Sequence, residues 1–408
     1  MKVTILNARL VTAQSQRHGP LHIADGRLVE ATPPGARTLD LRDHLIFPGL
    51  INAHEHLPLN GVPSLPAHPP FSNSYEWIKA FQPYFSAPAI KAALAVPEHQ
   101  RQRQGGLKNL LSGVTTVLHH DPWDAKFTTA GFPVRVAQSF GWSHSLGLGL
   151  QIADCAICNL QSAICNLQSA MPHYGPPLPA SYQATPPDLP WIIHLAEGTD
   201  DLARSELGLL DELGCLGPNT LLVHGVGLDQ PGLERLVSAG AGLVWCPASN
   251  LRLLGRTLAP AALAYLAAHG RLTLGSDSRI SGAFDLLAEL RVAATHSDLA
   301  PATLLRLVTT DAARLLRLSD VGGLTAGMRA DLLILPDAGG DPYAALLAAE
   351  RADLRAVLRD GRPVIADPDL ANWFAILGVE AIAATLDGRA KLVDSRLAPF
   401  TGLEEGFG

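Results

Sequence analysis

The chain has 408 residues, with 31 Lys and Arg against 38 Asp and Glu. A formal net charge of −7 excludes the basic surface typical of nucleic-acid-binding proteins, and 47% apolar against 17% charged residues excludes a mostly disordered chain. Five Cys are too few, and odd in number, for a disulfide framework. No run approaches ~20 uninterrupted apolar residues, and the first residues lack the apolar core of a secretory signal. We therefore expect a cytoplasmic protein that does not enter the membrane.

Strand patterns occur near both ends of the chain. Apolar residues alternate in Met1–Leu10, His22–Glu30, Ala330–Leu335 and Arg355–Ile365, and turns rich in Gly and Asp bound these segments. Such alternation favours antiparallel strands. We predict one small, discontinuous β-sandwich domain, with residues 1–47 as its first part and residues 327–408 as its second part and C-terminal tail.

Short apolar runs alternate with amphipathic stretches through the middle of the chain. The expected helices are Leu202–Leu213, Leu233–Ala239, Pro260–His269 and Ala283–Thr295. Strand–helix alternation indicates βαβ units around a parallel sheet, and a (β/α)8 barrel typically takes ~250 residues. We therefore predict the α/β class, with a (β/α)8 TIM barrel over residues 48–326.

One segment repeats within the predicted barrel. Ala156–Ser162 (AICNLQS) recurs letter for letter as Ala163–Ser169. Two heptads are too few for a coiled coil, which needs ~3–4. We interpret the repeat as a tandem duplication in a surface segment.

A His-x-His pair follows the first strand-like run of the predicted barrel. Residues two apart on a strand point to the same side, so His54 and His56 can bind one ion. Neutral imidazole suits Zn, Fe or Ni. By itself the pair is also compatible with two ordinary polar residues.

Three more chemically capable residues stand where apolar runs end, namely His194, His224 and Asp277. Functional groups of a (β/α)8 barrel lie at the carboxyl ends of its strands. The 138 residues from His56 to His194 correspond to about four βα units, and the 30 residues to His224 to one. The spacing favours strands 1, 5, 6 and 8 as the carriers of these groups.

The order of the motifs resembles the amidohydrolase superfamily, in particular the branch of cytosine, guanine and adenosine-type deaminases and triazine hydrolases. The segments that carry the resemblance are Pro48–Leu57, His194–Glu197, Val223–Val226, Cys246–Asn250, Leu274–Ser278 and Gly322–Leu332.

The resemblance implies a metal site and catalytic roles. His54, His56, His194 and Asp277 would hold one divalent ion per subunit, with Zn²⁺ as first choice and Fe²⁺ as the alternative. Glu197 would shuttle protons, His224 would orient the attacking hydroxide or polarise the bond attacked, and Asp277 could also accept the water proton. Binuclear members of the superfamily add a carboxylated Lys, but this sequence has no Lys between Lys126 and Lys391.

Other polar and aromatic residues near the predicted strand ends are candidates for substrate binding. Each of these residues is also compatible with a role in packing alone. Each of the two Arg residues is compatible with binding a carboxylate, the polar edge of a heterocycle or an acidic residue at the surface. These candidates are Trp77, His119, His120, Trp142, His144, Asn250, Arg252 and Arg279.

The favoured function is hydrolytic deamination of an amino-substituted N-heterocycle, such as a purine, pyrimidine, pterin or triazine. The alternatives are hydrolysis of a cyclic or linear amide or urea C–N bond, hydrolytic dechlorination, and a non-enzymatic binding protein with a degenerate site. We expect a small-molecule substrate and neither nucleic acid nor membrane as a partner, and the pattern allows a homodimer.

Overall fold

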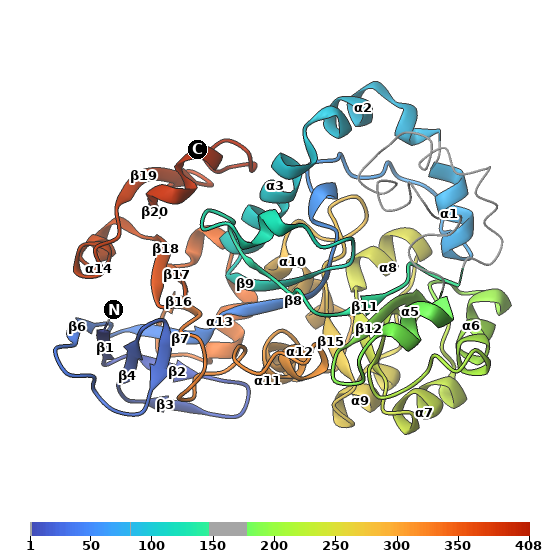
Figure 1. Cartoon of the computed structure of the whole chain (residues 1–408), viewed down its shortest axis with the longest axis horizontal. Helices are drawn as coiled ribbons and strands as arrows, with labels where there is room; N and C mark the ends of the chain where they lie inside the picture. The colour runs from blue at the N-terminus through green and yellow to red at the C-terminus, as the bar shows by residue number, and fades with distance from the viewer. Residues whose placement is uncertain (1, 82, 147–177) are drawn as a thin grey trace.

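The computed structural model describes residues 2–81, 83–146 and 178–408 (Figure 1). A parallel barrel occupies one side of the molecule, and a smaller β region lies beside it, where the blue N-terminal strands meet the orange and red C-terminal strands. The tandem repeat at 156–169 is not among the described residues.

The small β region is built from both ends of the chain. One sheet has the order β5-β4-β1-β6, and a larger sheet has the order β19-β20-β18-β17-β16-β7-β2-β3. The N-terminal strands are β1 (Lys2–Leu6), β2 (Arg9–Val11), β3 (Gln16–His18), β4 (Leu21–Ala24), β5 (Arg27–Val29), β6 (Arg37–Asp40) and β7 (His44–Pro48). The C-terminal strands are β16 (Leu332–Pro336), β17 (Ala356–Arg359), β18 (Arg362–Ala366), β19 (Ala381–Leu386) and β20 (Arg389–Asp394).

Two segments far apart in the sequence join this region. β7 and β16 pair antiparallel, with Ile46 opposite Ile334. The turns at Asp25-Gly26 and Asp360-Gly361 have positive φ at both residues, the conformation that two-residue hairpins favour. The discontinuous small β region is thus as the sequence predicted, while the exact boundaries at 47/48 and 326/327 stay predictions.

The barrel strands follow one another around the ring and run parallel where they pair. In chain order they are β8 (Leu50–Glu55), β9 (Val114–His119), β10 (Arg135–Val136), β11 (Gly141–Trp142), β12 (Trp191–Leu195), β13 (Thr220–His224), β14 (Gly242–Trp245) and β15 (Leu272–Leu274). A parallel bridge between Glu55 and Asp277 brings the end of the first strand to the residues after the last one. This TIM-barrel fold places the ends of β8, β12, β13 and β15 around one mouth.

The third and fourth strand segments depart from the regular barrel pattern. β10 pairs with β9, and β11 pairs with β12, but only residues 137–140 separate the two segments. A crossover helix needs at least ~10–12 residues, so none intervenes here. One short stretch of chain therefore spans the space between β9 and β12.

The helices of the barrel region are α1 (Ser74–Phe81), α2 (Pro88–Ala95), α3 (Glu98–Leu111), α5 (Leu178–Ala184), α6 (Asp201–Glu212), α7 (Gln230–Ser238), α8 (Pro247–Leu254), α9 (Pro260–Ala268), α10 (Leu286–Thr295), α11 (Pro301–Leu307) and α12 (Thr310–Leu315). Four of them, α6, α7, α9 and α10, agree with the predicted amphipathic stretches to within about three residues. Two further helices, α13 (Pro342–Ala348) and α14 (Ala371–Ile376), belong to the C-terminal part.

Aspartate caps define the starts of the helices that follow the functional strands. Asp200, Asp229 and Asp285 accept hydrogen bonds from the backbone N–H three residues on, at the starts of α6, α7 and α10. Such caps satisfy backbone donors that a helix start leaves free. They fix where each strand-to-helix loop ends.

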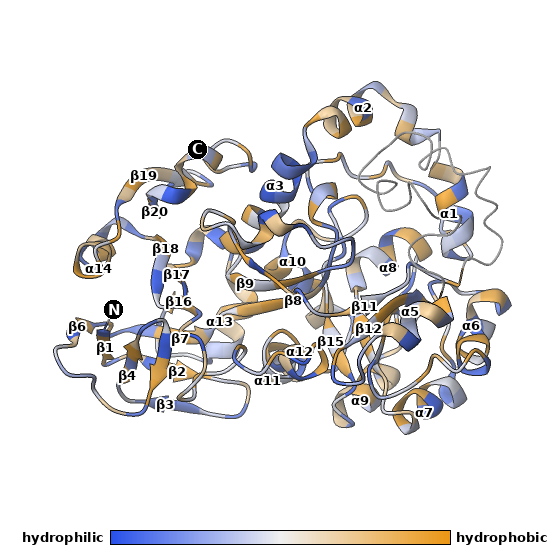
Figure 2. Ribbon diagram, viewed as in Figure 1, coloured by the Kyte–Doolittle hydropathy of each residue, from blue (hydrophilic) through white to orange (hydrophobic). Residues whose placement is uncertain are grey.

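The core of the barrel is apolar. Hydrophobic residues run along β8 in Figure 2, and Ile51, Ala53, Ile192, Val223 and Val244 are fully buried or nearly so. Within the described ranges, the helices are either too short or too polar to cross a lipid bilayer.

Candidate active site

The candidate residues stand on strained backbone at the mouth of the barrel. Ala196, His224 and Asp277 follow or end β12, β13 and β15, and all three have positive φ, at 52°, 77° and 57°. Residues with a side chain adopt this conformation at a cost of ~1–3 kcal/mol each, and such strain concentrates at functional sites. These positive φ values turn the chain sharply at the ends of the strands, where the functional side chains lie.

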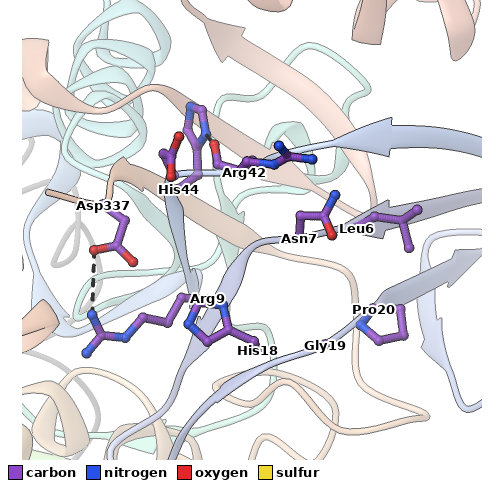
Figure 3. Close-up of a pocket in the computed structure, with 10 residues that line it drawn as sticks. Leu6, Asn7, Arg9, His18, Gly19, Pro20, Arg42, His44 and Asp337 are labelled. Atoms are coloured by element: carbon purple, nitrogen blue, oxygen red, sulfur yellow. Dashed lines mark hydrogen bonds and ion pairs between the residues drawn. The ribbon is translucent and has the colours of Figure 1, made fainter. Parts of the chain in front are cut away.

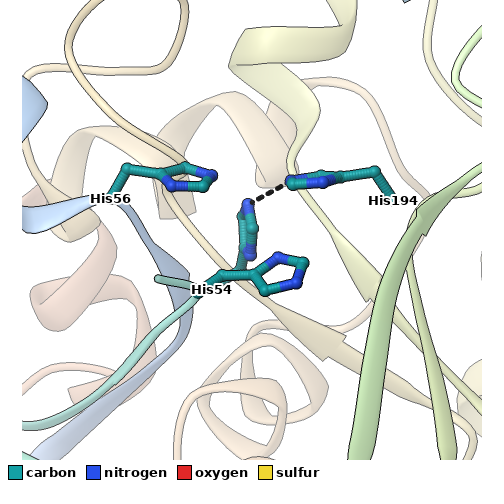
Figure 4. A group of neighbouring side chains, drawn as sticks. His54, His56 and His194 are labelled. Carbon is teal, nitrogen blue, oxygen red and sulfur yellow. Dashed lines mark hydrogen bonds between the residues drawn. The ribbon is translucent and has the colours of Figure 1, made fainter. Parts of the chain in front are cut away.

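Three imidazoles from the ends of two strands, those of His54, His56 and His194, converge in this mouth. Nε2 of His54 lies 3.2 Å from Nε2 of His194, the contact drawn as a dashed line in Figure 4. Oδ1 of Asp277 lies 3.6 Å from Nε2 of His54 and 3.7 Å from Nε2 of His56. Residues 140 positions apart in sequence thus present nitrogen atoms to a common point.

The outward nitrogens of two of these rings, those of His194 and His56, have partners that leave Nε2 facing inward. Nδ1 of His194 lies 2.9 Å from the backbone oxygen of His144, an acceptor only, so Nδ1 carries the proton. Nδ1 of His56 lies 3.0 Å from Oδ2 of Asp121. A carboxylate or carbonyl behind a ligating imidazole is the arrangement that metal sites use to orient their ligands.

The donor set fits a metal ion. A lone pair on Nε2 of His194 faces Nε2 of His54 at 3.2 Å, so a proton or a cation must lie between the rings. Burial lowers the pKa of His54 to about 4, which favours the neutral, ligating form over the protonated one. Among the described residues, Nδ1 of His54 has no hydrogen-bond partner. No neighbour therefore determines which ring nitrogen of His54 carries the proton.

The fourth ligand has two candidates. His54, His56, His120 and His194 offer ligand atoms that all lie within 4.8 Å of one another. Asp277, the predicted fourth ligand, lies within 3.7 Å of His54 and His56 through its Oδ1. Its other oxygen, Oδ2, accepts hydrogen bonds from Ser249 at 2.8 Å and Ser281 at 2.9 Å. Because the two hydroxyl groups bind Oδ2, Oδ1 remains available to bind an ion together with the histidines. Although burial opposes ionisation, the hydrogen bond and charge of His54 hold the pKa of Asp277 well below its usual range.

Glu197 lies in the same cavity as the histidines. Its Oε1 accepts a 3.0 Å hydrogen bond from the indole of Trp77, and its Oε2 lies 3.8 Å from Nε2 of His224. Burial raises the pKa of Glu197, partly against the charge of His224. A carboxyl whose pKa is moved towards neutrality is suited to both accept and return a proton.

His224 is oriented by a residue that the sequence suggested as a substrate ligand. Oδ1 of Asn250 lies 2.8 Å from Nδ1 of His224, and the amide of Asn250 donates to Thr257 at 3.2 Å. The amide orientation therefore makes Oδ1 an acceptor, and His224 carries its proton on Nδ1. Its Nε2 is left as an acceptor that faces the cavity.

The other substrate candidates divide into two groups. Trp77 and His144 line the cavity, and Trp142 packs edge-on against His120 at a centroid distance of 5.6 Å. His119 instead packs edge-on against Phe127, with its Nδ1 3.3 Å from the backbone oxygen of Glu55. It is a neighbour of the site that does not line the cavity.

Both predicted arginines point elsewhere. Arg252 donates to the backbone oxygen of Leu65. Arg279 donates to both oxygens of Glu404, at 3.0 and 2.5 Å, and lies 3.9 Å from the ring centre of Phe284. Neither residue lines the cavity, because buried acceptors in other parts of the chain hold their guanidinium groups.

The sequence analysis assigned no role to Glu55, the residue between the two histidines. Its side chain is fully buried, and Nζ of Lys108, also fully buried, lies 2.9 Å from Oε2. Asn109 donates to the same oxygen at 2.9 Å, and Asn60 donates to Oε1 at 3.0 Å. Although burial opposes ionisation, Lys108 and these donors hold the pKa of Glu55 below its ordinary value. The period-2 pattern gave the only signal, since it turns Glu55 away from His54 and His56.

Glu206, on α6, connects the site to the helix that covers it. Its Oε2 accepts from the backbone N–H of Ala196 at 2.6 Å, and Tyr75 on α1 donates to Oε1 at 2.5 Å. Burial raises the pKa of Glu206 to about 7. This contact and the Trp77–Glu197 hydrogen bond hold α1 over the mouth of the barrel.

A second hollow lies in the small β region, away from the histidines (Figure 3). It has a volume of about 610 Å³ and is wide open, and Arg9 and Asp337 face each other across it at 3.5 Å. The cavity at the barrel mouth is smaller, but it contains the converging imidazoles and Glu197. We place the candidate active site there for its chemistry.

Two features characterise this protein. Its fold is a TIM barrel, and a cluster of potential ligand histidines lies at the carboxyl ends of the barrel strands. A sequence model of the amidohydrolase family matches residues 187–364. This match agrees with the resemblance to the amidohydrolases that the motif order predicted.

Comparisons with individual proteins extend over most of the chain. An 8-oxoguanine deaminase of Pseudomonas aeruginosa is 29% identical over 82% of this chain and 87% of its own. A 5-methylthioadenosine/S-adenosylhomocysteine deaminase of Syntrophobacter fumaroxidans is 28% identical over 81% and 82%.

Solved structures show the same fold. A zinc-bound adenosine deaminase from Xanthomonas campestris has a TM-score of 0.66 at 20% identity, over 91% of this chain and 96% of its own. A zinc complex of atrazine chlorohydrolase from Arthrobacter aurescens has a TM-score of 0.68 at 21% identity, over 92% and 100%.

Proposed function

We propose that the chain is a metal-dependent deaminase that hydrolyses an amino-substituted N-heterocycle. The observation that carries this proposal is one cavity in which ligating imidazoles, the ionised Asp277 and the proton carrier Glu197 face each other. The two curated relatives described above are deaminases of purine compounds, which supports the same reaction class.

We propose His54, His56, His194 and Asp277 as the ligands of one divalent ion, Zn²⁺ first, with His120 as the alternative fourth ligand. A bound divalent ion lowers the pKa of a coordinated water towards ~7 and polarises the group attacked. Zinc in the two structural neighbours supports this choice of metal. Asp121 and the His144 carbonyl keep two of the rings in the ligating orientation.

The residues around the ion account for the proton transfers. Glu197 takes a proton from the attacking water and delivers it to the ring nitrogen of the substrate, and then helps the amino group leave as ammonia. Nε2 of His224 accepts a hydrogen bond from the attacking water and orients it. In the overall reaction, the substrate C–NH₂ and water become C=O and NH₃, with one water proton on the ring nitrogen and the other in the ammonia.

Ammonia release tests this function. The zinc-loaded enzyme, assayed with aminated purines, pyrimidines, pterins and triazines, should release ammonia from at least one of these classes. Silence across the whole panel would overturn the proposal. Release of chloride from a chlorotriazine, or of a carboxylate from a cyclic amide or urea, would instead identify the alternative hydrolase reactions.

Metal analysis tests the ligand set independently of turnover. We expect about one zinc ion per chain, because the sequence offers no Lys between Lys126 and Lys391 to bridge a second ion. His54→Ala should lose the ion, while the matched variant His269→Ala, at an exposed position on the outside of the barrel, should keep it. Two tightly held ions that are both required for turnover would contradict the single-metal site.

A further inference from the structure

Glu289, on α10, is a buried carboxyl group that takes no part in the proposed chemistry. It is fully buried, and it does not line the candidate active-site cavity. Its Oε1 accepts a hydrogen bond from the backbone N–H of Ala248 at 2.8 Å, and its Oε2 accepts one from the backbone N–H of Ala283 at 3.1 Å. The first donor follows β14 and the second follows β15. One carboxyl group therefore joins two of the strand-to-helix connections at the mouth of the barrel.

The local structure explains both hydrogen bonds of Glu289. Helical side chains tilt towards the N-terminus, so a residue in the first turn of α10 points back to the loop before that helix. The helix α8 has no side-chain cap at Cys246, so the N–H of Ala248 needs an acceptor from elsewhere. Burial raises the pKa of Glu289 to about 8, but each carboxyl oxygen keeps a lone pair in both protonation states. Both N–H groups are thus accepted whether or not the group is ionised.

Each of the two connections that Glu289 joins also carries a serine that binds Asp277. Ser249 is next to the first donor in the sequence, and Ser281 is two residues from the second. Both serines are buried, and their hydroxyl groups donate to Oδ2 of Asp277 at 2.8 and 2.9 Å. The two hydroxyl oxygens lie 2.9 Å apart. Oδ2 therefore receives one hydrogen bond from each connection.

The loop after β15 leaves little freedom to Ser281. The N–H of Gly282 donates to the backbone oxygen of Ser278 at 2.7 Å, and a Cβ atom on Gly282 would collide with the backbone oxygen of Ser276. Only glycine fits such a close approach of the backbone. Ser281 thus lies between a tight turn on one side and the N–H group bound by Glu289 on the other.

We propose that Glu289 is a positioning residue for Asp277. By joining the two connections it places both serine hydroxyl groups on Oδ2, and Oδ1 is left facing the histidines. This inference rests on the proposed function, in which Asp277 is a metal ligand, and it adds a residue from outside the cavity to that site. Residues that support a ligand in this way commonly contribute ~10–100-fold to metal affinity or activity.

Zinc affinity measured without substrate tests this role. Glu289→Gln keeps the size of the side chain, but its NH₂ group faces one of the two backbone N–H donors, so one connection loses its acceptor. We expect the Kd for zinc, measured by competition with a chelator, to rise about tenfold. The matched control Glu234→Gln makes the same change at an exposed position on α7 and should leave the Kd unchanged.

A second variant covers the case in which Glu289→Gln does not fold. Glu289→Asp keeps the carboxyl group but is one methylene shorter, so it cannot reach both donors at their present distances. It should raise the Kd for zinc in the same direction. In whichever variant folds, kcat should fall about tenfold with KM nearly unchanged, because Glu289 does not line the cavity. A native Kd in that variant would overturn the inference.

A double-mutant cycle separates positioning from simple packing. When Ser249→Ala and Ser281→Ala are combined, Asp277 loses both hydroxyl donors, so adding Glu289→Gln should change the Kd for zinc by less than about twofold. Packing alone would give the same loss with and without the serines. An equal effect of Glu289→Gln in the two backgrounds would therefore overturn the inference.

Asp277→Asn distinguishes failure of this inference from failure of the proposed site. A higher Kd for zinc in Asp277→Asn, together with a native Kd in Glu289→Gln, would overturn the positioning role alone. A native Kd in both variants would overturn Asp277 as a ligand as well. Because these measurements need no substrate, a lack of ammonia release would contradict the deaminase reaction and not the positioning role.

Discussion

Glu197→Gln should lower kcat by ~10²–10⁴-fold while zinc remains bound. The amide keeps the size of the side chain and can still receive the Trp77 hydrogen bond, but it cannot take a proton from water or return one to the substrate. Glu197 is not among the proposed ligands, so metal content should not change. Steady-state kinetics and metal analysis on the same preparation measure both quantities.

A matched variant controls for the loss of one negative charge. Glu212→Gln removes a carboxylate from the exposed end of α6 and should leave kcat and zinc content unchanged. Full turnover in Glu197→Gln would refute the proton-transfer role. Loss of the ion in that variant would show that Glu197 is needed for metal binding.

Lys108→Met should lower the free energy of unfolding by about 3–5 kcal/mol. The substitution leaves the carboxylate of Glu55 buried without its ammonium partner, in a network that also includes Ser276 at 3.1 Å from Nζ. Because this network underlies both His54-Glu55-His56 and the residue before Asp277, we also expect weaker zinc retention. Urea denaturation of the zinc-loaded protein measures the first effect, and dialysis against a chelator the second.

Two further variants serve as a control and as a rescue test for this prediction. Lys91→Met, at an exposed position on α2, should change stability by no more than about 0.5 kcal/mol. Glu55→Gln combined with Lys108→Met removes both charges and should recover part of the loss, because the uncompensated carboxylate is gone. Equal stability of Lys108→Met and Lys91→Met would contradict the importance of the buried pair.

The pair should also make stability depend on pH. The folded-state pKa of Glu55 is below its unfolded value, so its contribution is present above the unfolded value of 4.5 and is lost as pH falls through the folded one. The advantage of the native protein over Lys108→Met should therefore shrink under acid conditions.

The three histidines that lie together in the cluster share one property. His54 and His194 lie on strands and His56 directly follows the strand of His54, and the order of parallel strands brings these strand ends together. Their convergence could therefore be predicted from spacing and motif order. The discontinuous small β region was predictable for a related reason, since both of its ends carry hairpins with short turns.

The two arginine candidates that turned away from the cavity lie on a helix and in a loop, where no local rule fixes side-chain direction. Asn250 meets His224 because α8 begins directly after β14, and this contact needs the tertiary arrangement of two strands. Arg279 is held by Glu404, which is 125 residues further along the chain. No pattern around Arg279 could reveal that partner.

The Arg279–Glu404 contact also has a consequence for the order in which the protein matures. Ribosomes add ~5–20 residues per second, so Glu404 is made about 6–25 s after Arg279. During that interval the loop that carries Asp277 lacks the carboxylate that will hold it. The segment that carries Glu404 is therefore translated last, although it supports a site whose other groups were translated much earlier. A nascent barrel that already has all its strands is not yet an assembled enzyme.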